Sequence, residues 1–111
     1  MASGSEVKLA EEARIQLEAS GIPTRLVSVP CLDRLLKQDA AFIENLRGEA
    51  DVIIAVEAGL EVSWPKVIGL RGHFIGMTGF GASAPASELY EHFGITTQAI
   101  IDLAQNKLKH P

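Results

Sequence analysis

One carboxylate stands where α/β proteins commonly place ligand-binding groups. Glu57 directly follows residues 51–56, Asp-Val-Ile-Ile-Ala-Val, whose unbroken apolar run is typical of a strand buried on both faces. A group just beyond the carboxyl end of a parallel strand lies where ligands bind in open α/β sheets. Glu57 is therefore a candidate ligand contact or acid/base group. The alternative is a structural carboxylate that accepts hydrogen bonds from nearby loop amides.

A glycine-rich segment further along the chain contains Gly76, Gly79 and Gly81, followed by Ser83. Such loops allow backbone amides to approach a phosphate closely. The segment lacks the Lys-Ser/Thr pair of a P-loop, and its spacing differs from that of the dinucleotide motif Gly-x-Gly-x-x-Gly. The alternative is a tight crossover that needs small residues. Gly79, Gly81 and Ser83 therefore remain weak candidates for a ligand contact.

The only tryptophan of the chain, Trp64, precedes Pro65 and Lys66 in a predicted loop. Trp is enriched at the centres of protein interfaces, so Trp64 and Lys66 are candidates for a contact with another protein. The alternative is that the indole closes one end of the hydrophobic core. The residue pattern favours neither interpretation clearly.

Metal binding and nucleophilic catalysis find little support in the sequence. The histidines His73, His92 and His110 include no pair with the i, i+4 spacing of a helical metal site. His73 is expected to begin a strand. The single cysteine, Cys31, has no activating neighbour in the sequence and is expected to be a small buried side chain. We therefore expect no metal-binding residue and no nucleophile among these side chains.

Composition restricts the class of protein further. The chain has 111 residues, with 14 acidic and 10 basic side chains and a formal net charge of −4. That length suits one domain with a real core. Nucleic acids and anionic membranes are bound mainly through Lys and Arg, so neither is an expected partner. No apolar run approaches the roughly 20 residues of a membrane helix, and no secretory signal is visible, so a cytoplasmic protein is expected.

Helices and strands are predicted to alternate along the chain. Ser3 and Glu6 have the spacing of a capping box, which predicts a first helix that ends before Gly21. Further helices are expected over 31–38, 40–47, from Pro85 to Gly94 and from Thr96 to Leu108, and strands over 24–29, 51–56, 66–70 and 73–77.

This order predicts an α/β fold with three layers, in which helices flank a mostly parallel mixed sheet of about four or five strands. The pair 66–70 and 73–77, separated by Arg71-Gly72, suggests a hairpin and therefore one antiparallel strand. The first helix begins almost at Met1, and residues 1–3 are expected to be too few for a central strand.

Eight short blocks, in this order and spacing, resemble the C-terminal domain of bacterial and plant transketolases. The most specific is Phe80-Gly-Ala-Ser-Ala-Pro85. The others are Ala2-Ser-Gly-Ser-Glu-Val7, Val27-Ser-Val-Pro30, Lys37-Gln-Asp-Ala-Ala41, Ala55-Val-Glu-Ala-Gly59, Trp64-x-Lys66-x-x-Gly69-Leu70, Ile75-Gly-Met77 and Leu89-Tyr-Glu-x-Phe-Gly-Ile-Thr96.

The resemblance implies a single domain over residues 1–111 that lacks its first strand. It also implies a parent enzyme that transfers a two-carbon ketol unit between sugar phosphates, with thiamine diphosphate and a divalent metal. In transketolases the Gly-Asp-Gly cofactor motif belongs to the first two domains, and this sequence contains no Gly-Asp-Gly. No catalytic or cofactor-binding residue therefore maps onto this chain, because the cofactor carries the chemistry.

Two functional hypotheses follow from the resemblance. In the first, the chain is a structural or assembly domain that is inactive alone and has the other transketolase domains or a second subunit as partners. In the second, it is an independent ligand-binding or regulatory module, or the small subunit of a split transketolase. An uncovered sheet gap would invite another chain, so a homodimer or higher oligomer is also expected.

Overall fold

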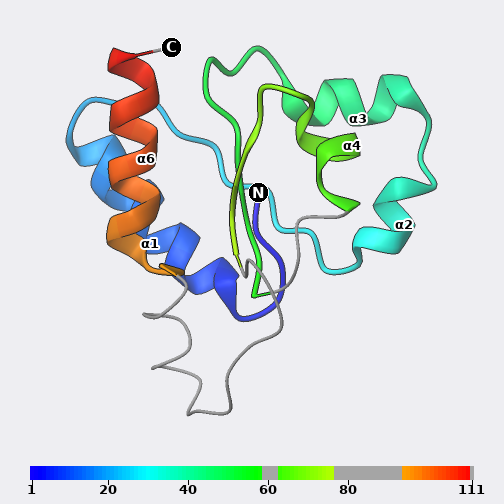
Figure 1. Ribbon diagram of the computed structural model, residues 1–111, viewed down its shortest axis with the longest axis horizontal. Coiled ribbons are helices and arrows are strands. Elements are labelled where there is room, and N and C mark those ends of the chain that lie inside the picture. The colour runs from blue at the N-terminus through cyan, green and yellow to red at the C-terminus, as the bar shows by residue number, and fades with distance from the viewer. Residues whose placement is uncertain (59–62, 77–93, 111) are drawn as a thin grey trace.

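The computed structural model describes residues 1–58, 63–76 and 94–110 (Figure 1). Helices lie on both sides of a short central sheet, with α1 and α6 on one side and α2, α3 and α4 on the other. This layered arrangement agrees with the predicted α/β class. Within the described residues, no helix is both long enough and apolar enough to cross a membrane.

The first layer consists of α1 (Glu6–Ala19) and α6 (Thr97–Lys109), which lie side by side. Each helix buries an apolar stripe at helical spacing, which in α1 comprises Ala10, Ala13 and Leu17. The hydroxyl of Thr96 accepts a hydrogen bond of 3.1 Å from the amide of Ala99, so it caps α6, where the sequence allows either Thr96 or Thr97 in this role. The hydroxyl of Thr97 donates to the carbonyl of Leu9 at 3.1 Å and joins the start of α6 to α1.

The second layer consists of α2 (Leu32–Leu36), α3 (Ala40–Arg47) and α4 (Pro65–Ile68). Asp39 begins α3 with a side-chain cap, because its Oδ1 accepts from the amide of Phe42 at 2.8 Å. These helices pack around a second apolar cluster that includes residues of the sheet: Val29, Leu35, Ile43, Ala55, Trp64, Val67 and Ile68.

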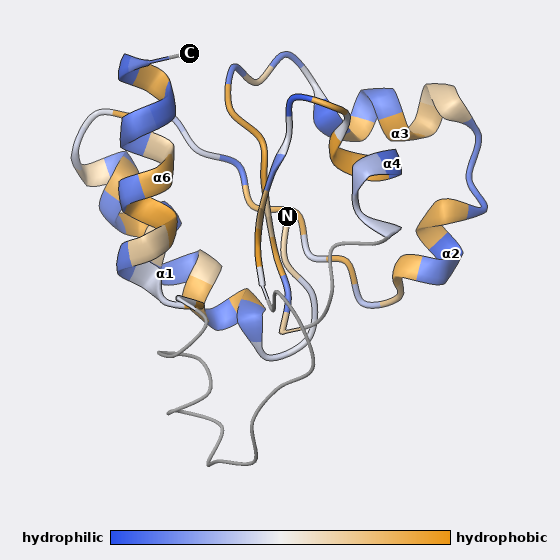
Figure 2. Cartoon of the chain, in the orientation of Figure 1, coloured by the Kyte–Doolittle hydropathy of each residue, from blue (hydrophilic) through white to orange (hydrophobic). Residues whose placement is uncertain are grey.

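The sheet between the layers is parallel. β1 (Ile54–Val56) pairs with β2 (His73–Ile75), with Ile54 opposite His73. On the other side of β1, Ala2 forms parallel bridges to both Val56 and Ser28. The order across the sheet is therefore residues 27–29, residues 1–3, β1 and β2, although residues 1–3 and 27–29 form only isolated bridges. Figure 2 shows that hydrophobic residues concentrate along these central segments.

Two local predictions are wrong. Residues 66–70 form no strand, because Pro65 begins the short helix α4, and Gly69, with a φ of 80°, ends it. The predicted hairpin is therefore absent, and β2 runs parallel to β1. The Ser3–Glu6 capping box is also absent: Ser5 is the N-cap residue and makes no side-chain cap bond.

Other predictions are met in part. Of the expected strand over 24–29, only Ser28 takes part in a bridge. The described residues form one sheet of two strands, so the expected four or five strands are not confirmed. They contain no antiparallel pair. The helix expected after Pro85 lies outside the described residues.

Candidate functional site

Glu57 lies at the carboxyl end of β1 and joins three parts of the chain. Its Oε1 accepts a hydrogen bond of 3.1 Å from the hydroxyl of Ser3, and its Oε2 accepts one of 2.8 Å from the indole Nε1 of Trp64. The amide of Glu57 donates to the carbonyl of Ile75 at 3.1 Å, which extends the pairing of β1 with β2. Both carboxylate oxygens are thus engaged within the chain. This arrangement corresponds to the structural alternative, with side chains rather than loop amides as the donors.

Trp64 is completely buried, with 0 % of its surface exposed. Its ring belongs to the second apolar cluster, between α4 and the sheet. The alternative in which the indole closes the core is therefore the one that the structure shows, and Trp64 offers no surface to another protein. The indole N–H still needs an acceptor at this depth, and Glu57 provides it.

Lys66 lies on the exposed side of α4, away from the Glu57 carboxylate bonds. Its Nζ donates to the carbonyl of Leu36 at 3.2 Å, which ties α4 to the last residue of α2. The side chain remains exposed, so a role in an interface stays a prediction.

Of the glycine-rich segment, only Gly76 is among the described residues, and Gly79, Gly81 and Ser83 lie outside them. A Cβ built on Gly76 would lie 2.3 Å from the ring of Phe74 and 2.6 Å from the carbonyl oxygen of Glu57. No side chain fits in that space, so this position needs glycine for packing. The ligand role of the other three residues remains untested.

Of the residues considered for metal binding and nucleophilic chemistry, His92 lies outside the described residues. Within residues 1–58, 63–76 and 94–110, no group of three or more His, Cys, Asp or Glu side chains could hold a metal ion. His73 begins β2, as predicted. Cys31 is exposed and free, so the expectation that it is buried is wrong. It is the N-cap residue of α2.

The amino group of Met1 is a buried polar group that the sequence reasoning missed. It donates a hydrogen bond of 2.7 Å to the carbonyl of Ile54 in β1. Burial lowers the pKa of this group from 8.0 to about 6, and the positive charge of Arg25 acts in the same direction. No local sequence signal predicts this burial, because it depends on pairing between residues 53 positions apart.

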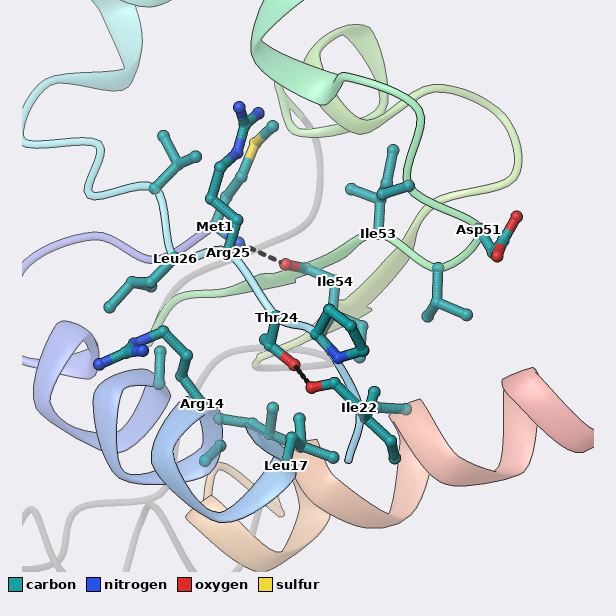
Figure 3. Close-up of a pocket in the computed structure, with 18 of the residues that line it drawn as sticks. Met1, Arg14, Leu17, Ile22, Thr24, Arg25, Leu26, Asp51, Ile53 and Ile54 are labelled. Carbon is teal, nitrogen blue, oxygen red and sulfur yellow. Dashed lines mark hydrogen bonds between the residues drawn. The ribbon is translucent and has the colours of Figure 1, made fainter. Parts of the chain in front are cut away.

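The same amino group borders a cavity of about 420 Å³ (Figure 3). The cavity lies between α1 and α6 on one side and the segments 22–27 and 49–54 on the other. Its lining is mainly apolar, with Leu17, Ile22 and Ile54 among the contributors. It adjoins the amino end of β1, whereas Glu57 lies at the carboxyl end. Among the described candidates, Glu57, Trp64 and Lys66 do not line it.

Comparison with known proteins gives a consistent result across the chain. Residues 1–96 match the family model described as "Transketolase-like TK C-terminal domain". The chain is 46% identical over 109 residues to Transketolase 1 of Vibrio vulnificus (strain YJ016), and 45% identical over 109 residues to Transketolase 1 of Escherichia coli (strain K12). In both comparisons the match covers 97% of this chain and 16% of the relative.

Solved structures give the same result. The fold matches transketolase from Leishmania mexicana with a TM-score of 0.80 and 37% identity, and it matches transketolase from Campylobacter jejuni with a TM-score of 0.76 and 30% identity. These matches cover 97% and 95% of this chain, respectively, and 16% of each solved chain. The chain thus spans about a sixth of the length of its relatives. It belongs to the transketolase family, in which it corresponds to the C-terminal domain.

Proposed function

We propose that this chain acts as a structural domain of a transketolase, supporting the assembly of the enzyme without carrying out ketol transfer itself. The observation that carries the proposal is the coverage: 97% of the chain matches only 16% of each curated relative. The rest of those transketolases is available to bind the cofactor and to form the active site.

The polar contacts of the described residues support the same role. Both oxygens of Glu57 are held by donors from the chain itself, and Trp64 is buried beneath them. A carboxylate with both oxygens engaged is poorly placed to move a proton for a substrate. The contacts instead fix residues 1–3, β1 and α4 against one another, which is what a packing domain requires.

The transketolase cofactor does not fit the described residues. Thiamine diphosphate binds with a divalent cation, and such cations require several oxygen ligands. The described residues provide no cluster of that kind, and the cavity beside Met1 is mainly apolar. In the proposal, thiamine diphosphate and the metal therefore belong to the other transketolase domains, which are also the partners of this chain. We place the assembly in the cytoplasm as a dimer or higher oligomer.

An activity assay tests the inactive role directly. The purified chain is assayed for ketol transfer between sugar phosphates, with thiamine diphosphate and Mg²⁺ added. We expect no turnover above that of a boiled sample. Turnover above that control would contradict the proposal.

A second assay tests the assembly role. The chain is mixed with the first two domains of a transketolase, produced separately, and the mixture is examined by size-exclusion chromatography and for activity. Co-elution supports a packing domain, and recovered activity on mixing favours the split-enzyme form of the function. Absence of any complex would count against an assembly role.

The alternative function, a regulatory module, receives less support. The glycine-rich segment, Glu57 and Trp64 motivate it. Glu57 and Trp64 are engaged inside the domain, whereas Gly79, Gly81 and Ser83 lie outside the described residues. A thermal-shift screen with nucleotides and sugar phosphates is the appropriate test. We expect no change in Tm, and a saturable rise with one compound would favour the regulatory role over the structural one.

A further inference from the structure

The turn between α4 and β2 holds Leu70 at its tip in a fixed position. The amide of Gly72 donates to the carbonyl of Gly69 at 3.1 Å and closes the turn. Gly69 has a φ of 80°, and a Cβ on Gly72 would lie 2.5 Å from the side chain of Ile68, so both positions need glycine. The backbone on either side of the tip is therefore restricted by packing and by a hydrogen bond.

Leu70 differs from the other large apolar side chains at the surface. It is 101% exposed, whereas the next most exposed one in the described part of the chain, Ile15, is 54% exposed. Single apolar side chains that are partly exposed are common on protein surfaces. Leu70 buries nothing against its own domain, so the free energy of burying it is gained only in contact with another surface.

A buried donor without an acceptor lies beside this turn. Arg47 is the last residue of α3, which contacts α4 (Figure 1). Its guanidinium packs against Gly69, with Nη1 only 2.9 Å from the place of a Cβ on that glycine. The Nε of Arg47 is buried and has no hydrogen-bond partner. Buried polar groups are normally hydrogen-bonded, because an unsatisfied one loses its interaction with water and gains nothing.

The described residues do not provide a carboxylate for Arg47. Across residues 1–58, 63–76 and 94–110, the only ion pair joins Arg14 to Glu11 within α1. The loop that follows α3 carries Glu49 and Asp51, and neither of them pairs with Arg47. A guanidinium presents its N–H groups in a planar fork that matches a carboxylate with two parallel hydrogen bonds. A carboxylate from another molecule or domain would therefore satisfy this group.

We infer that residue 47 and the turn 69–72, which together we call the α3–α4 corner, form the surface through which this domain packs against another domain of the transketolase. In this contact a carboxylate of the partner domain binds Arg47, and an apolar recess of the partner encloses Leu70. The inference rests on the proposed function, and it names the surface and the chemistry of the contact that the assembly role requires.

The size of the relatives and the character of the corner point to this partner. The chain matches only 16% of Transketolase 1 of Vibrio vulnificus (strain YJ016), so most of that enzyme lies outside the matched part and is available for contact. An apolar centre beside a charged, hydrogen-bonding group is typical of specific protein interfaces. The corner combines both, with Leu70 at the tip of the turn and Arg47 at its base.

A binding experiment with four variants tests the inference. The full chain is titrated by calorimetry into the first two domains of a transketolase, produced separately. Leu70→Ser and Arg47→Met alter the corner, and methionine keeps the aliphatic length of Arg47 while removing its donors. Ile15→Ser and Arg34→Met are the matched controls, because they remove an exposed apolar side chain from α1 and an exposed guanidinium from α2.

We expect each corner variant to raise the Kd at least tenfold and each control variant to raise it by less than about threefold. The Tm of the isolated chain separates docking from a role in folding. Leu70→Ser should leave Tm within about 2 °C of the original, because the side chain is fully exposed. Arg47→Met should not lower Tm, because it removes an unsatisfied donor. A lower Tm with an unchanged Kd would show that Arg47 is structural and would overturn its assignment.

NMR of the arginine side chains tests the donor itself. The Nε–H signal of Arg47 should shift when the complex forms. The Nε–H of Arg14, which already donates to Glu11 at 3.1 Å, is the internal reference and should not shift. A shift of the Arg47 signal on addition of inorganic phosphate alone, at millimolar concentration, would assign the group to a small anion and contradict a carboxylate of the partner domain.

The possible failures can be told apart. If the chain binds the two domains and the corner variants bind as well as the controls do, the inference is wrong and the proposed function stands. If the unmodified chain forms no complex, both are wrong. If Leu70→Ser abolishes self-association of the chain and leaves binding to the two domains unchanged, the corner is a contact between copies, which also overturns the inference.

Discussion

At the carboxyl ends of the strands, Ser3 and Trp64 donate to the two oxygens of Glu57, whereas at the amino end of β1 the Met1 residue borders a cavity of about 420 Å³. The first region is closed by side-chain contacts that span the sheet and a helix. The second is bounded by backbone groups and apolar side chains. The difference shows that the residues with the most obvious chemistry stabilise the domain, while the cavity is lined mainly by apolar side chains.

The largest expected effect comes from removing the indole that supports the closed region. Trp64→Ala should lower the free energy of unfolding by about 3–5 kcal/mol, because it leaves a large cavity and removes a donor from Glu57. Urea denaturation measures the change. Trp64→Phe is the matched control, since it keeps most of the apolar volume and loses the N–H. A loss below about 1 kcal/mol for the alanine variant would contradict the core role of Trp64.

The buried amino group of Met1, beside the cavity, predicts that the stability of the fold depends on pH. The pKa of the Met1 amino group is about 6 in the folded chain and 8.0 in the unfolded chain, so the unfolded state binds more protons between these values. The free energy of unfolding should therefore rise from pH 6 to pH 8 by about 2–3 kcal/mol and be lost as the pH falls through this range.

Denaturation at a series of pH values measures this dependence. The matched control is the same chain with an acetylated amino group, which can still donate to Ile54 but cannot take up a proton. The acetylated chain should lack this component of the pH dependence. Equal slopes for the two chains between pH 6 and pH 8 would show that the Met1 amino group is not the cause.

A smaller effect is expected from the carboxylate of the closed region. Glu57→Gln should cost about 1–2 kcal/mol of stability, because an amide presents one acceptor oxygen to two donors. Ser3→Ala should cost about 0.5–1.5 kcal/mol, since it removes only one of those donors. A double-mutant cycle on these two residues gives their coupling. Strictly additive effects would indicate that Ser3 and Glu57 do not interact in solution.

The smallest expected effect concerns the charge of Arg25, which acts on the Met1 amino group. Arg25→Gln removes one of the two causes of the lowered Met1 pKa, and it is the lesser cause after burial. The folded-state pKa should therefore rise toward 8.0, and the pH-dependent part of the stability should become smaller. NMR titration of the amino group measures the shift. A pKa that falls in the variant would contradict the assigned role of Arg25.

The sequence patterns predicted those elements that are set by local periodicity. The apolar stripes of α1 and α6 and the helix over residues 40–47 agree with expectation, and the strand before Glu57 is found over Ile54–Val56 of the expected 51–56. In each case the deciding interactions lie within a few residues of one another. The resemblance to the C-terminal domain of transketolases also rested on short blocks, and the comparisons confirm it.

The predictions that failed concern segments for which two local structures compete. Residues 66–70 are apolar enough for a strand, but Pro65 and Gly69 favour a short helix between them. Ser3 has the correct spacing for a helix cap, yet its hydroxyl donates to Glu57, which lies 54 positions away. Cys31 was expected to be buried on its residue type alone. Its exposure depends on where the chain leaves the sheet.

For Glu57 and Trp64, the sequence identified the residues without determining their roles. Their types and their positions around a buried strand made them candidates, and two interpretations of each remained open. Only the fold showed that the indole and the carboxylate bond to each other at 2.8 Å inside the domain.

The sequence by itself determined the family, the amphipathic helices and the strand before Glu57, because these depend on residue type and on spacing along the chain. Only the tertiary structure decided that Glu57 and Trp64 stabilise the carboxyl end of the sheet, that the Met1 amino group is buried, and that a cavity lies beside it. The physical reason is that each of these features comes from groups distant in sequence, and backbone hydrogen bonding leaves no signature in residue type.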